Sequence, residues 1–487
     1  MSCVVIGSGI TGMVAALLLA RQGYAVTLIE AQRQAAPLLR GFQRNGLSFN
    51  TGFHIGGGLH EGGVLKTWFR ALGLNAALHN ISTGHKDIFR FADGGNYFLP
   101  SGHAQIIEAI EGQFPGSGPN MRDFLMQADA ALAHSPYTNP AIRHDPSFFF
   151  NTQGSLAQFI EKAQFPPHLR AMLNTRCLLY GVAPHQAGWD EYALVAGPYF
   201  QSSGTWDGGG AALANALLEA LRQAGVTVLC GSAVCTLEAT KNEGIRAAHL
   251  ASGTRLPCEF CFFTGHPNQL EGLLPKGLLR PAHYRRIQAM PETQPALLLF
   301  AEAPADLLQD DESIYLLPSA NSPDLFPCES EPEPSVCLFC DRAENAQGRK
   351  AVLAIALMRE EDLPPGNPQP RPQAYRAWKQ NAVRRLVLHI EKRLPELQGA
   401  WRVFDAASAL TFREWIYRST GSLYGIRHDI MGAPLMPITR IPGLFLAGQN
   451  ILLPGILGGI ISAALAVGFA IGHDKALEEF RKCASNA

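Results

Sequence analysis

The feature that most constrains the fold is a glycine-rich turn near the N-terminus, between a predicted strand and a predicted helix. Strand Cys3–Ile6 leads into a hexapeptide of the form G-x-G-x-x-G, and helix Ile10–Gln22 and strand Ala25–Glu30 follow it. In this pattern the first glycine permits a tight turn, the second lets the backbone approach a pyrophosphate, and the third lets the helix pack closely on the strand. The strand–helix–strand context therefore predicts a Rossmann-like dinucleotide-binding domain.

The second predicted strand ends in a carboxylate, Glu30. A carboxylate at this place can accept hydrogen bonds from the ribose of an adenosine, and it would repel a 2′-phosphate. We expect the dinucleotide to contact seven residues of this region: Gly7, Ser8, Gly9, Ile10, Thr11, Gly12 and Glu30.

Two observations favour FAD over NAD as the cofactor. No second G-x-G-x-x-G lies between a predicted strand and helix, so the chain lacks the extra domain with which many flavin reductases hold NAD(P)H. In addition, Gly443–Gly472 is a second glycine-rich turn, from strand Leu444–Ala447 to a helix that begins near Ile456. The N-terminus of such a helix is suited to lie beside a flavin ring or its ribityl chain.

The same C-terminal segment must also be weighed as a membrane span. Residues 441–472 carry no charge and exceed the roughly 20 residues that a spanning helix needs. However, prolines and glycines, which interrupt helices, divide the segment at Pro442-Gly443, Gly448, Pro454-Gly455 and Gly458-Gly459. We therefore predict a buried strand–turn–helix there.

Charge and cysteine content exclude several classes of protein. The 40 basic and 41 acidic residues give a formal net charge of −1, which argues against a nucleic-acid binder that neutralises phosphates. Ten cysteines in 487 residues are too few for a disulfide scaffold, and the first basic residue, Arg21, comes too late for a secretory signal. We expect a cytoplasmic protein.

Two cysteine pairs, Cys258/Cys261 and Cys337/Cys340, have the spacing of half a zinc site. Both pairs lie in apolar runs typical of strands, where residues three apart face opposite sides. We therefore expect packed thiols and no metal site.

The pattern of elements changes along the chain in a way that predicts two domains. Residues 66–204 are rich in aromatic side chains and helical patterns, whereas a helix near 211–223 and several short strands follow Gly208. We expect an α/β fold in which residues 1–65, 205–275 and 405–487 form a discontinuous FAD-binding domain, and residues 66–204 and 276–404 form an inserted α+β substrate or lid domain.

Three segments give the chain a resemblance to a known family. The first is the glycine turn with Glu30, the second is Asn45–His54, which is similar to NGLxFDTGxH, and the third runs from Thr411-Phe412-Arg413 through Gly421–Gly425 and His428-Asp429 to Pro442–Asn450. These segments resemble the phytoene desaturases, carotenoid isomerases and retinol saturases, a branch of the glutathione-reductase-like FAD flavoproteins. The middle segments Gly208-Gly209-Gly210 and His266-Pro267 are also similar to that family.

The resemblance has departures at several positions. Ala36-Pro37 stands where the family has two glycines, and Asn50 and Asn450 stand where it has aspartates. Amides keep hydrogen-bonding capacity but cannot serve as carboxylates.

The resemblance implies a glutathione-reductase-like, Rossmann-like FAD domain and the saturation, desaturation or isomerisation of carbon–carbon double bonds. The substrate would be a small lipophilic molecule, namely a long polyene or isoprenoid lipid. The expected partners are an external electron donor or acceptor and a membrane that the protein contacts peripherally; the oligomeric state stays open. With this resemblance we expect further cofactor contacts at Arg40, Gly52, Val234, Gly448, Gln449, Gly458 and Ile460.

Reduction of a double bond adds one hydride and one proton, so a saturase also needs a proton donor. The candidates are Tyr424, His428 and His54, although each of them is also ordinary turn material. Two alternatives stay open: a non-catalytic lipid- or prenyl-binding protein on the same fold, and an amine-oxidase-like flavoenzyme.

Overall fold

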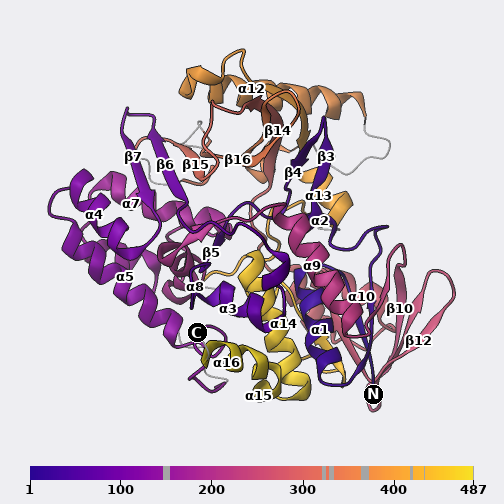
Figure 1. Ribbon diagram of the computed structural model, residues 1–487. Helices are drawn as coiled ribbons and strands as arrows, with labels where there is room; N and C mark the ends of the chain where they lie inside the picture. The colour runs from indigo at the N-terminus through magenta and orange to yellow at the C-terminus, as the bar shows by residue number, and fades with distance from the viewer. Residues whose placement is uncertain are drawn as a thin grey trace.

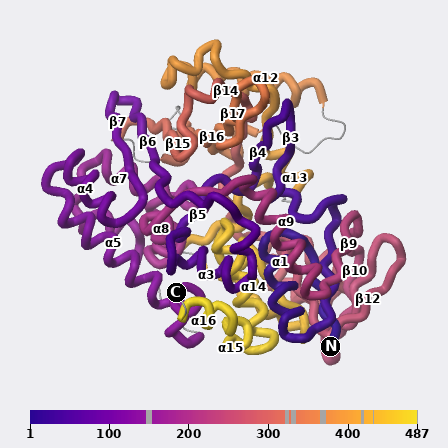
Figure 2. The backbone as a smooth tube through the Cα atoms, in the orientation of Figure 1, coloured from indigo at the N-terminus to yellow at the C-terminus, as the bar shows by residue number. Residues whose placement is uncertain are grey.

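The structure is a computed structural model that describes residues 1–145, 154–320, 325–327, 334–363, 372–416, 420–430, 432 and 434–485. Its helices and strands form two layered units, each built on one large sheet (Figure 1). The indigo N-terminal helix α1 and the yellow C-terminal helix α14 lie next to each other in the lower unit, although they come from opposite ends of the chain (Figure 2).

The lower unit contains a five-stranded parallel sheet of order β19-β13-β1-β2-β9. Its strands are β1 (Ser2–Ile6), β2 (Ala25–Ile29), β9 (Thr227–Leu229), β13 (Phe260–Phe263) and β19 (Leu444–Leu446), and its main helices are α1 (Ile10–Arg21), α9 (Gly209–Gln223) and α14 (Gly455–Ile471). A small antiparallel sheet, β10 (Val234–Thr240), β11 (Gly244–Leu250) and β12 (Arg255–Pro257), is attached to it. The strand–helix–strand start predicted from the sequence is confirmed.

Hydrophobic packing explains why α14 is almost entirely apolar. Twelve of its 17 residues are buried, and the core that they share with α1 includes Leu17 and Leu465, neither of which is exposed. The predicted buried strand–turn–helix is confirmed by β19 and α14. Across the described part of the chain, no helix combines the length and apolar character that crossing a bilayer requires.

The upper unit contains a seven-stranded sheet of order β18-β14-β17-β16-β15-β6-β7, antiparallel except where β15 pairs with β6. Its strands are β6 (Lys86–Phe91), β7 (Asn96–Pro100), β14 (Ala296–Pro304), β15 (Glu312–Leu317), β16 (Val336–Glu344), β17 (Arg349–Leu357) and β18 (Arg402–Ala407). Helix α12 (Gln373–Arg393) covers one face at the top of Figure 1, through Leu386 and Ile390. The other face packs on a helical layer.

That helical layer is formed by α4 (His103–Gln113), α5 (Gly118–Ala133), α6 (Leu156–Lys162), α7 (Pro167–Asn174) and α8 (Trp189–Gln201). The remaining helices are α2 (Pro37–Arg40), α3 (Val64–Ala71), α10 (Leu270–Leu273), α11 (Pro281–Gln288), α13 (Ala409–Ile416), α15 (His473–Ala476) and α16 (Glu478–Ser485). The remaining strands are β3 (Phe42–Arg44), β4 (Leu47–Phe49), β5 (Gly56–Gly57) and β8 (Ser203–Gly204).

Two elements run across the domain boundaries expected from the sequence. Helix α3 extends past residue 65, and its Trp68 and Phe69 are fully buried in the core shared by α1 and α14. Strand β18 extends past residue 404 and pairs with β14 in the upper sheet. In both places the packing of the element sets the domain boundary. The composition of the segment does not reveal that packing.

The two cysteine pairs differ in whether their thiols face opposite sides or the same side. Cys337 and Cys340 both lie on β16 and contact the cores on opposite faces of the upper sheet, as predicted for a strand. The prediction is wrong for Cys258, which lies between β12 and β13 and faces the same core as Cys261. A turn between two short strands allows both thiols to point to one side.

Candidate active site

The N-terminal glycines occupy the carboxyl end of β1, at the centre of the parallel sheet where the strand order reverses. Gly7 has φ +100°, and a Cβ there would overlap the Thr264 hydroxyl, so only glycine fits the turn. A Cβ at Gly12 would overlap the Gly7 carbonyl oxygen. A Cβ at Gly9 would meet no atom within 4 Å. The open side of the turn is therefore at Gly9, where a pyrophosphate can approach the N-terminus of α1.

Glu30 follows β2 and is 8% exposed. Its carboxylate accepts hydrogen bonds from the Ser8 backbone N–H at 3.0 Å, from the Ser8 hydroxyl at 2.6 Å and from the Gln32 N–H at 2.8 Å. A carboxylate has about four acceptor positions, so one remains for a ribose hydroxyl. Glu30 thus fastens the glycine turn to β2, a structural role that sequence reasoning missed.

Arg40 and Val234 lie around the same end of the sheet. Arg40 is half-buried and donates from Nε to the Ala35 carbonyl at 2.8 Å. Burial and then the charge of Glu30 raise the pKa of Cys230, whereas Arg40 lowers it, so both charges lie near this thiol. Val234 is half-buried at the start of β10, packed against the core that contains Ile29.

The expected contacts Ile10, Thr11 and Ile460 serve helix packing. A Cβ at Gly459 of α14 would lie 2.5 Å from Ile10 Cγ2 and 3.1 Å from Thr11 Oγ1. Ile460 has no exposed surface and belongs to the core between α1 and α14. A side chain without exposed surface offers no contact area to a ligand, so any contact of Ile460 would be through its backbone.

The start of α14 has one open position, and it is Gly455. Gly455 has φ +86°, is exposed, and has no atom within 4 Å of an added Cβ. The expected contact Gly458 is instead enclosed, because a Cβ there would overlap the Leu453 carbonyl. The Pro454-Gly455 pair at the start of the helix was the available signal for this position in the sequence.

The turn between β19 and α14 is hydrogen-bonded to the loop that carries Tyr424. The Gly448 N–H donates to the Ser462 hydroxyl at 2.8 Å, and the Gln449 side-chain amide donates to the Tyr424 carbonyl at 2.7 Å. His428 Nε2 donates to the Gln449 carbonyl at 2.6 Å. The Asn450 side-chain carbonyl accepts the Ile426 N–H at 3.0 Å. Asn450 therefore keeps the acceptor function of the expected aspartate.

A buried carboxylate, Glu292, anchors the start of this loop. It accepts hydrogen bonds from the hydroxyls of Thr420 and Ser422, the latter at 2.7 Å, and lies 3.3 Å from His266 Nε2. Burial raises the pKa of Glu292, but the hydrogen bonds from His266, Thr420 and Ser422 outweigh it and hold the pKa at about 2. His266 and Ser422 lie in segments noted from the sequence, but Glu292 itself was missed, because Thr420 and Ser422 are more than 120 residues away along the chain.

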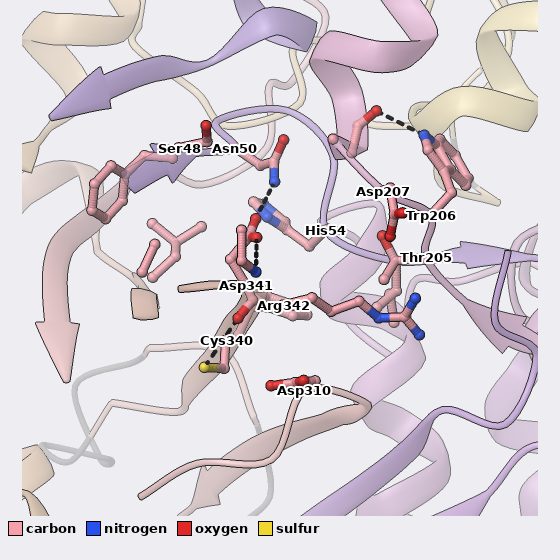
Figure 3. Close-up of a pocket in the computed structure, with 18 of the residues that line it drawn as sticks. Ser48, Asn50, His54, Thr205, Trp206, Asp207, Asp310, Cys340, Asp341 and Arg342 are labelled. Carbon is pink, nitrogen blue, oxygen red and sulfur yellow. Dashed lines mark hydrogen bonds between the residues drawn. The ribbon is translucent and has the colours of Figure 1, made fainter. Parts of the chain in front are cut away.

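Two cavities adjoin where the upper sheet meets the lower unit. The first, of about 220 Å³, lies between residues 48–55, residues 205–209 and strands β15 to β17 (Figure 3). The second, of about 120 Å³, is lined by Gly52–Gly57, α8, Tyr424 and residues 452–461. His54, Ile55 and Phe339 line both cavities. The expected cofactor contact Gly52 is exposed at the second one.

The three proton-donor candidates are in different surroundings. His54 stacks on Phe339 with ring centroids 4.6 Å apart, and burial lowers its pKa to about 4, so it is neutral at pH 7. Burial also lowers the pKa of His428, which lines neither cavity and holds the Gln449 carbonyl. Tyr424 lines the second cavity. His428 is thus hydrogen-bonded to the turn before α14.

Asn50 is paired with a carboxylate that sequence reasoning missed. Its amide nitrogen donates to Asp341 Oδ2 at 3.0 Å, and its amide oxygen accepts the Gly210 N–H at 3.2 Å. Asp341 lies on β16, and Figure 3 shows it beside Asn50 and His54. With an aspartate at position 50, two carboxylates would face each other. The 291 residues between the partners leave no local signal of this pair.

Known proteins resemble this chain over most of its length. Residues 5–72 match the family described as an NAD(P)-binding Rossmann-like domain. The human all-trans-retinol 13,14-reductase is 23% identical over 527 residues, covering 95% of this chain and 84% of that protein. The 4,4′-diapophytoene desaturase (4,4′-diaponeurosporene-forming) of Staphylococcus haemolyticus is 25% identical over 210 residues, covering 40% of this chain and 41% of that protein.

A solved structure shares the whole fold. An oxidoreductase from Methanosarcina mazei superposes with a TM-score of 0.64 at 13% identity, covering 95% of this chain and 99% of that one. The predicted fold class, an α/β protein with a Rossmann-like domain, is confirmed. The matches imply a dinucleotide cofactor of the flavin or nicotinamide class.

Substitution of the two glycines of the turn should destabilise the chain without cofactor to different extents. We expect Gly12→Ala to lower the free energy of unfolding by about 1–3 kcal/mol or more, because the methyl group meets the Gly7 carbonyl. Gly9→Ala has free space and should cost less than about 1 kcal/mol, the difference between these residues at a helix N-cap. Urea unfolding of the apoprotein measures both; equal losses would contradict the assignment of the close contact.

Proposed function

We propose that this chain, which belongs to the family of the retinol saturases and phytoene desaturases, is an FAD-dependent oxidoreductase that acts on carbon–carbon double bonds of a long lipophilic polyene or isoprenoid. The observation that carries this proposal is the cavity between Gly52, Tyr424 and the start of α14. Its walls are largely aliphatic side chains of α8 and of residues 452–461. Such walls hold a lipophilic substrate away from water.

FAD suits the dinucleotide site for reasons of geometry. Gly9 and Gly455 begin α1 and α14, and both have open space where a Cβ would stand. Two helix N-termini, which attract anions and polar ring oxygens, therefore face the same region. Glu30 keeps one acceptor for the ribose, and Gly52 offers bare backbone at the other end. Bound FAD would supply hydride exchange with a carbon of the double bond.

Replacement of Glu30 tests the cofactor assignment. We expect Glu30→Ala to weaken FAD affinity by about 1–3 kcal/mol, the value of a hydrogen bond to a charged group, or roughly 5- to 150-fold in Kd. Glu30→Gln, which keeps one acceptor oxygen, should lose less. Titration with FAD, followed by flavin fluorescence, measures both affinities. Because Glu30 also binds Ser8, urea unfolding of each apoprotein is the control for a loss of stability. Unchanged FAD affinity in Glu30→Ala would show that this carboxylate does not contact the cofactor.

Residues that line the second cavity, and residues that hold its walls in place, would have different roles in a reduction. The Tyr424 side chain lines the cavity and carries a hydroxyl, which can deliver a proton to a carbon of the double bond. Neutral His54 can donate or accept one hydrogen bond there, but at pH 7 it is not an imidazolium acid. His428 keeps Gln449 in place. Glu292 and its hydroxyl partners hold the loop that presents Tyr424.

We predict that Tyr424→Phe slows product formation by about 10²-fold, the usual contribution of a general acid. The replacement keeps the ring and deletes only the hydroxyl, so flavin reduction by dithionite should be unchanged. Substrates for this assay are retinoids, carotenoids and unsaturated fatty-acyl compounds, under anaerobic conditions. His54→Gln is the matched comparison within the cavity, and His428→Gln should weaken cofactor retention instead of the chemical step. Normal turnover by Tyr424→Phe on a confirmed substrate would rule out this donor.

We also propose an external electron donor and peripheral membrane contact. The chain has one dinucleotide fingerprint, so net reduction needs electrons from another protein or small reductant. A substrate of this class dissolves in bilayers. We expect the protein to sediment with phospholipid vesicles and to be released by carbonate or high salt; release only by detergent would contradict peripheral contact.

The amine-oxidase-like alternative has one observation in its favour. Tyr199, Tyr424 and Phe339 line the second cavity, and the Asp341 carboxylate lies in the first. Aromatic rings and a carboxylate are groups that stabilise an ammonium. Bleaching of the bound flavin by primary amines, without oxygen, would favour this alternative. A purified protein that stays colourless after addition of FAD would instead favour a non-catalytic lipid-binding protein.

A further inference from the structure

A short segment that leads into α11 carries a local concentration of positive charge. Residues 276–286 contain one lysine, three arginines and one histidine, and neither aspartate nor glutamate, although the whole chain has a net charge of −1. The side chains of Lys276, Arg280 and Arg285 are exposed and form no ion pair within the described part of the chain. These three charges are therefore open to a partner outside the chain.

A fifth cation, Arg440, reaches the same place from the loop before β19. Burial lowers the pKa of His283 on α11, and the charges of Arg286 and Arg440 lower it further, so both arginines lie close to this ring. Arg286 Nη2 also donates to the Pro434 carbonyl at 3.1 Å, which ties α11 to that loop. Two distant parts of the chain thus form one basic region. We call it the α11 surface, and its cations are Lys276, Arg280, Arg285, Arg286 and Arg440.

Carboxylates compensate this positive charge only in part. Asp429 is paired with Arg427 at 2.8 Å, and the buried Glu292 accepts the Ser422 hydroxyl. Glu271 is exposed and lies beside α11, because burial and then a hydrogen bond to Glu271 raise the pKa of Tyr284. One exposed carboxylate beside five cations leaves a net positive surface.

An exposed aliphatic side chain stands next to these cations. Ile438 is 49% exposed and lies two residues before Arg440. Its backbone pairs with Phe445 of β19, which fixes the position of this residue on the surface. Basic side chains attract anionic lipid headgroups, and an adjacent apolar side chain can enter the boundary between headgroups and acyl chains. A nucleic acid would use the cations but not the isoleucine.

The α11 surface is joined directly to the loop that carries Tyr424. In the segment that follows α11, the Pro291 carbonyl accepts the Arg427 N–H at 2.8 Å, and the Thr293 N–H donates to the Gly425 carbonyl at 2.8 Å. A partner bound at the α11 surface would therefore contact an element that helps to hold the candidate active site.

We propose that the α11 surface docks the protein on a bilayer that contains anionic phospholipids, with its cations against the headgroups and Ile438 inserted at the headgroup boundary. This inference rests on the proposed function, in which the substrate dissolves in bilayers. It names the surface that makes the peripheral contact.

Helix α12 presents a second basic face, which fits this role less well. Arg384 and Arg385 are exposed there, but a carboxylate lies nearby, since the pKa of Asp362 is lowered first by a hydrogen bond from Arg359 and also by the charge of Arg385. In addition, α12 covers the face of the upper sheet opposite the helical layer that contains α8, a wall of the second cavity (Figure 1). This face therefore serves as an internal control.

Sedimentation of the full FAD-loaded chain with vesicles tests the proposal. One set of vesicles is phosphatidylcholine alone, and the other has equal parts of phosphatidylcholine and phosphatidylserine. We expect much tighter binding to the mixed vesicles, and release when NaCl is raised from about 0.1 M to about 1 M, because the Debye length falls from about 10 Å to about 3 Å. The readout does not depend on turnover.

Two variants separate the charged part of the surface from its apolar part. Arg280→Gln/Arg285→Gln should weaken binding to mixed vesicles about 30-fold, or about fivefold for each cation, and should reduce the salt dependence. Ile438→Ser should weaken this binding about fivefold without changing the salt dependence.

The matched control is Arg384→Gln/Arg385→Gln, which removes the same charge from α12 and should bind as tightly as the unmodified chain. Equal losses in the two double variants would show that net charge alone drives binding, which overturns the α11 surface. Failure of the unmodified chain to bind mixed vesicles overturns it as well. Tighter binding to duplex DNA than to mixed vesicles, lost in Arg280→Gln/Arg285→Gln, would overturn it in favour of a nucleic acid.

Turnover of a detergent-dispersed polyene separates this inference from the proposed function. Turnover together with unchanged vesicle binding by Arg280→Gln/Arg285→Gln rejects the α11 surface alone. Loss of vesicle binding in that variant, when the unmodified chain converts no polyene, supports the surface and rejects the proposed chemistry alone.

Discussion

The close approach of backbone to backbone at Gly12 is the contact on which the cofactor end of the molecule depends. Because Gly12 has no Cβ, α1 can lie directly against the Gly7 carbonyl and thus against β1. A similar close approach occurs at Gly459, where the absence of a Cβ lets α14 pack on Ile10. Both helices therefore start at the same edge of the parallel sheet, and both leave an open glycine there. Dispersion and burial stabilise this arrangement, but only residues without side chains permit it.

Asn50 and Asn450 stand where the family that this chain resembles has aspartates, and the hydrogen bonds of both amides explain how the chain accommodates them. Asn450 accepts a backbone N–H through its side-chain oxygen, as an aspartate would, so this change preserves the turn before α14. Asn50 uses both ends of its amide, one on the backbone of α9 and the other on Asp341. The carboxylate next to Asn50 is that of Asp341, on β16 of the upper sheet.

Parts of the site were within reach of sequence reasoning because their partners are near in the chain. The glycine turn and Glu30 follow from a local strand–helix–strand pattern, and the turn before α14 follows from its glycines and prolines. Ser8 was expected to face the cofactor, but its hydroxyl binds Glu30. Residue type alone does not reveal which of two acceptors a hydroxyl takes, since that choice is made by distance in the folded chain.

The sequence by itself determined the Rossmann-like fold, the order of its first elements and the buried character of the C-terminal helix. Each of these is encoded in short-range periodicity and in residues with special backbone freedom. Only the tertiary structure decided that Asp341 meets Asn50, that Glu292 meets Ser422, and that His428 is occupied by a carbonyl. Such contacts join residues up to hundreds of positions apart, and hydrogen bonds act over about 3 Å. No pattern along the chain can carry that information, because only the packing of the two sheets brings those atoms within reach.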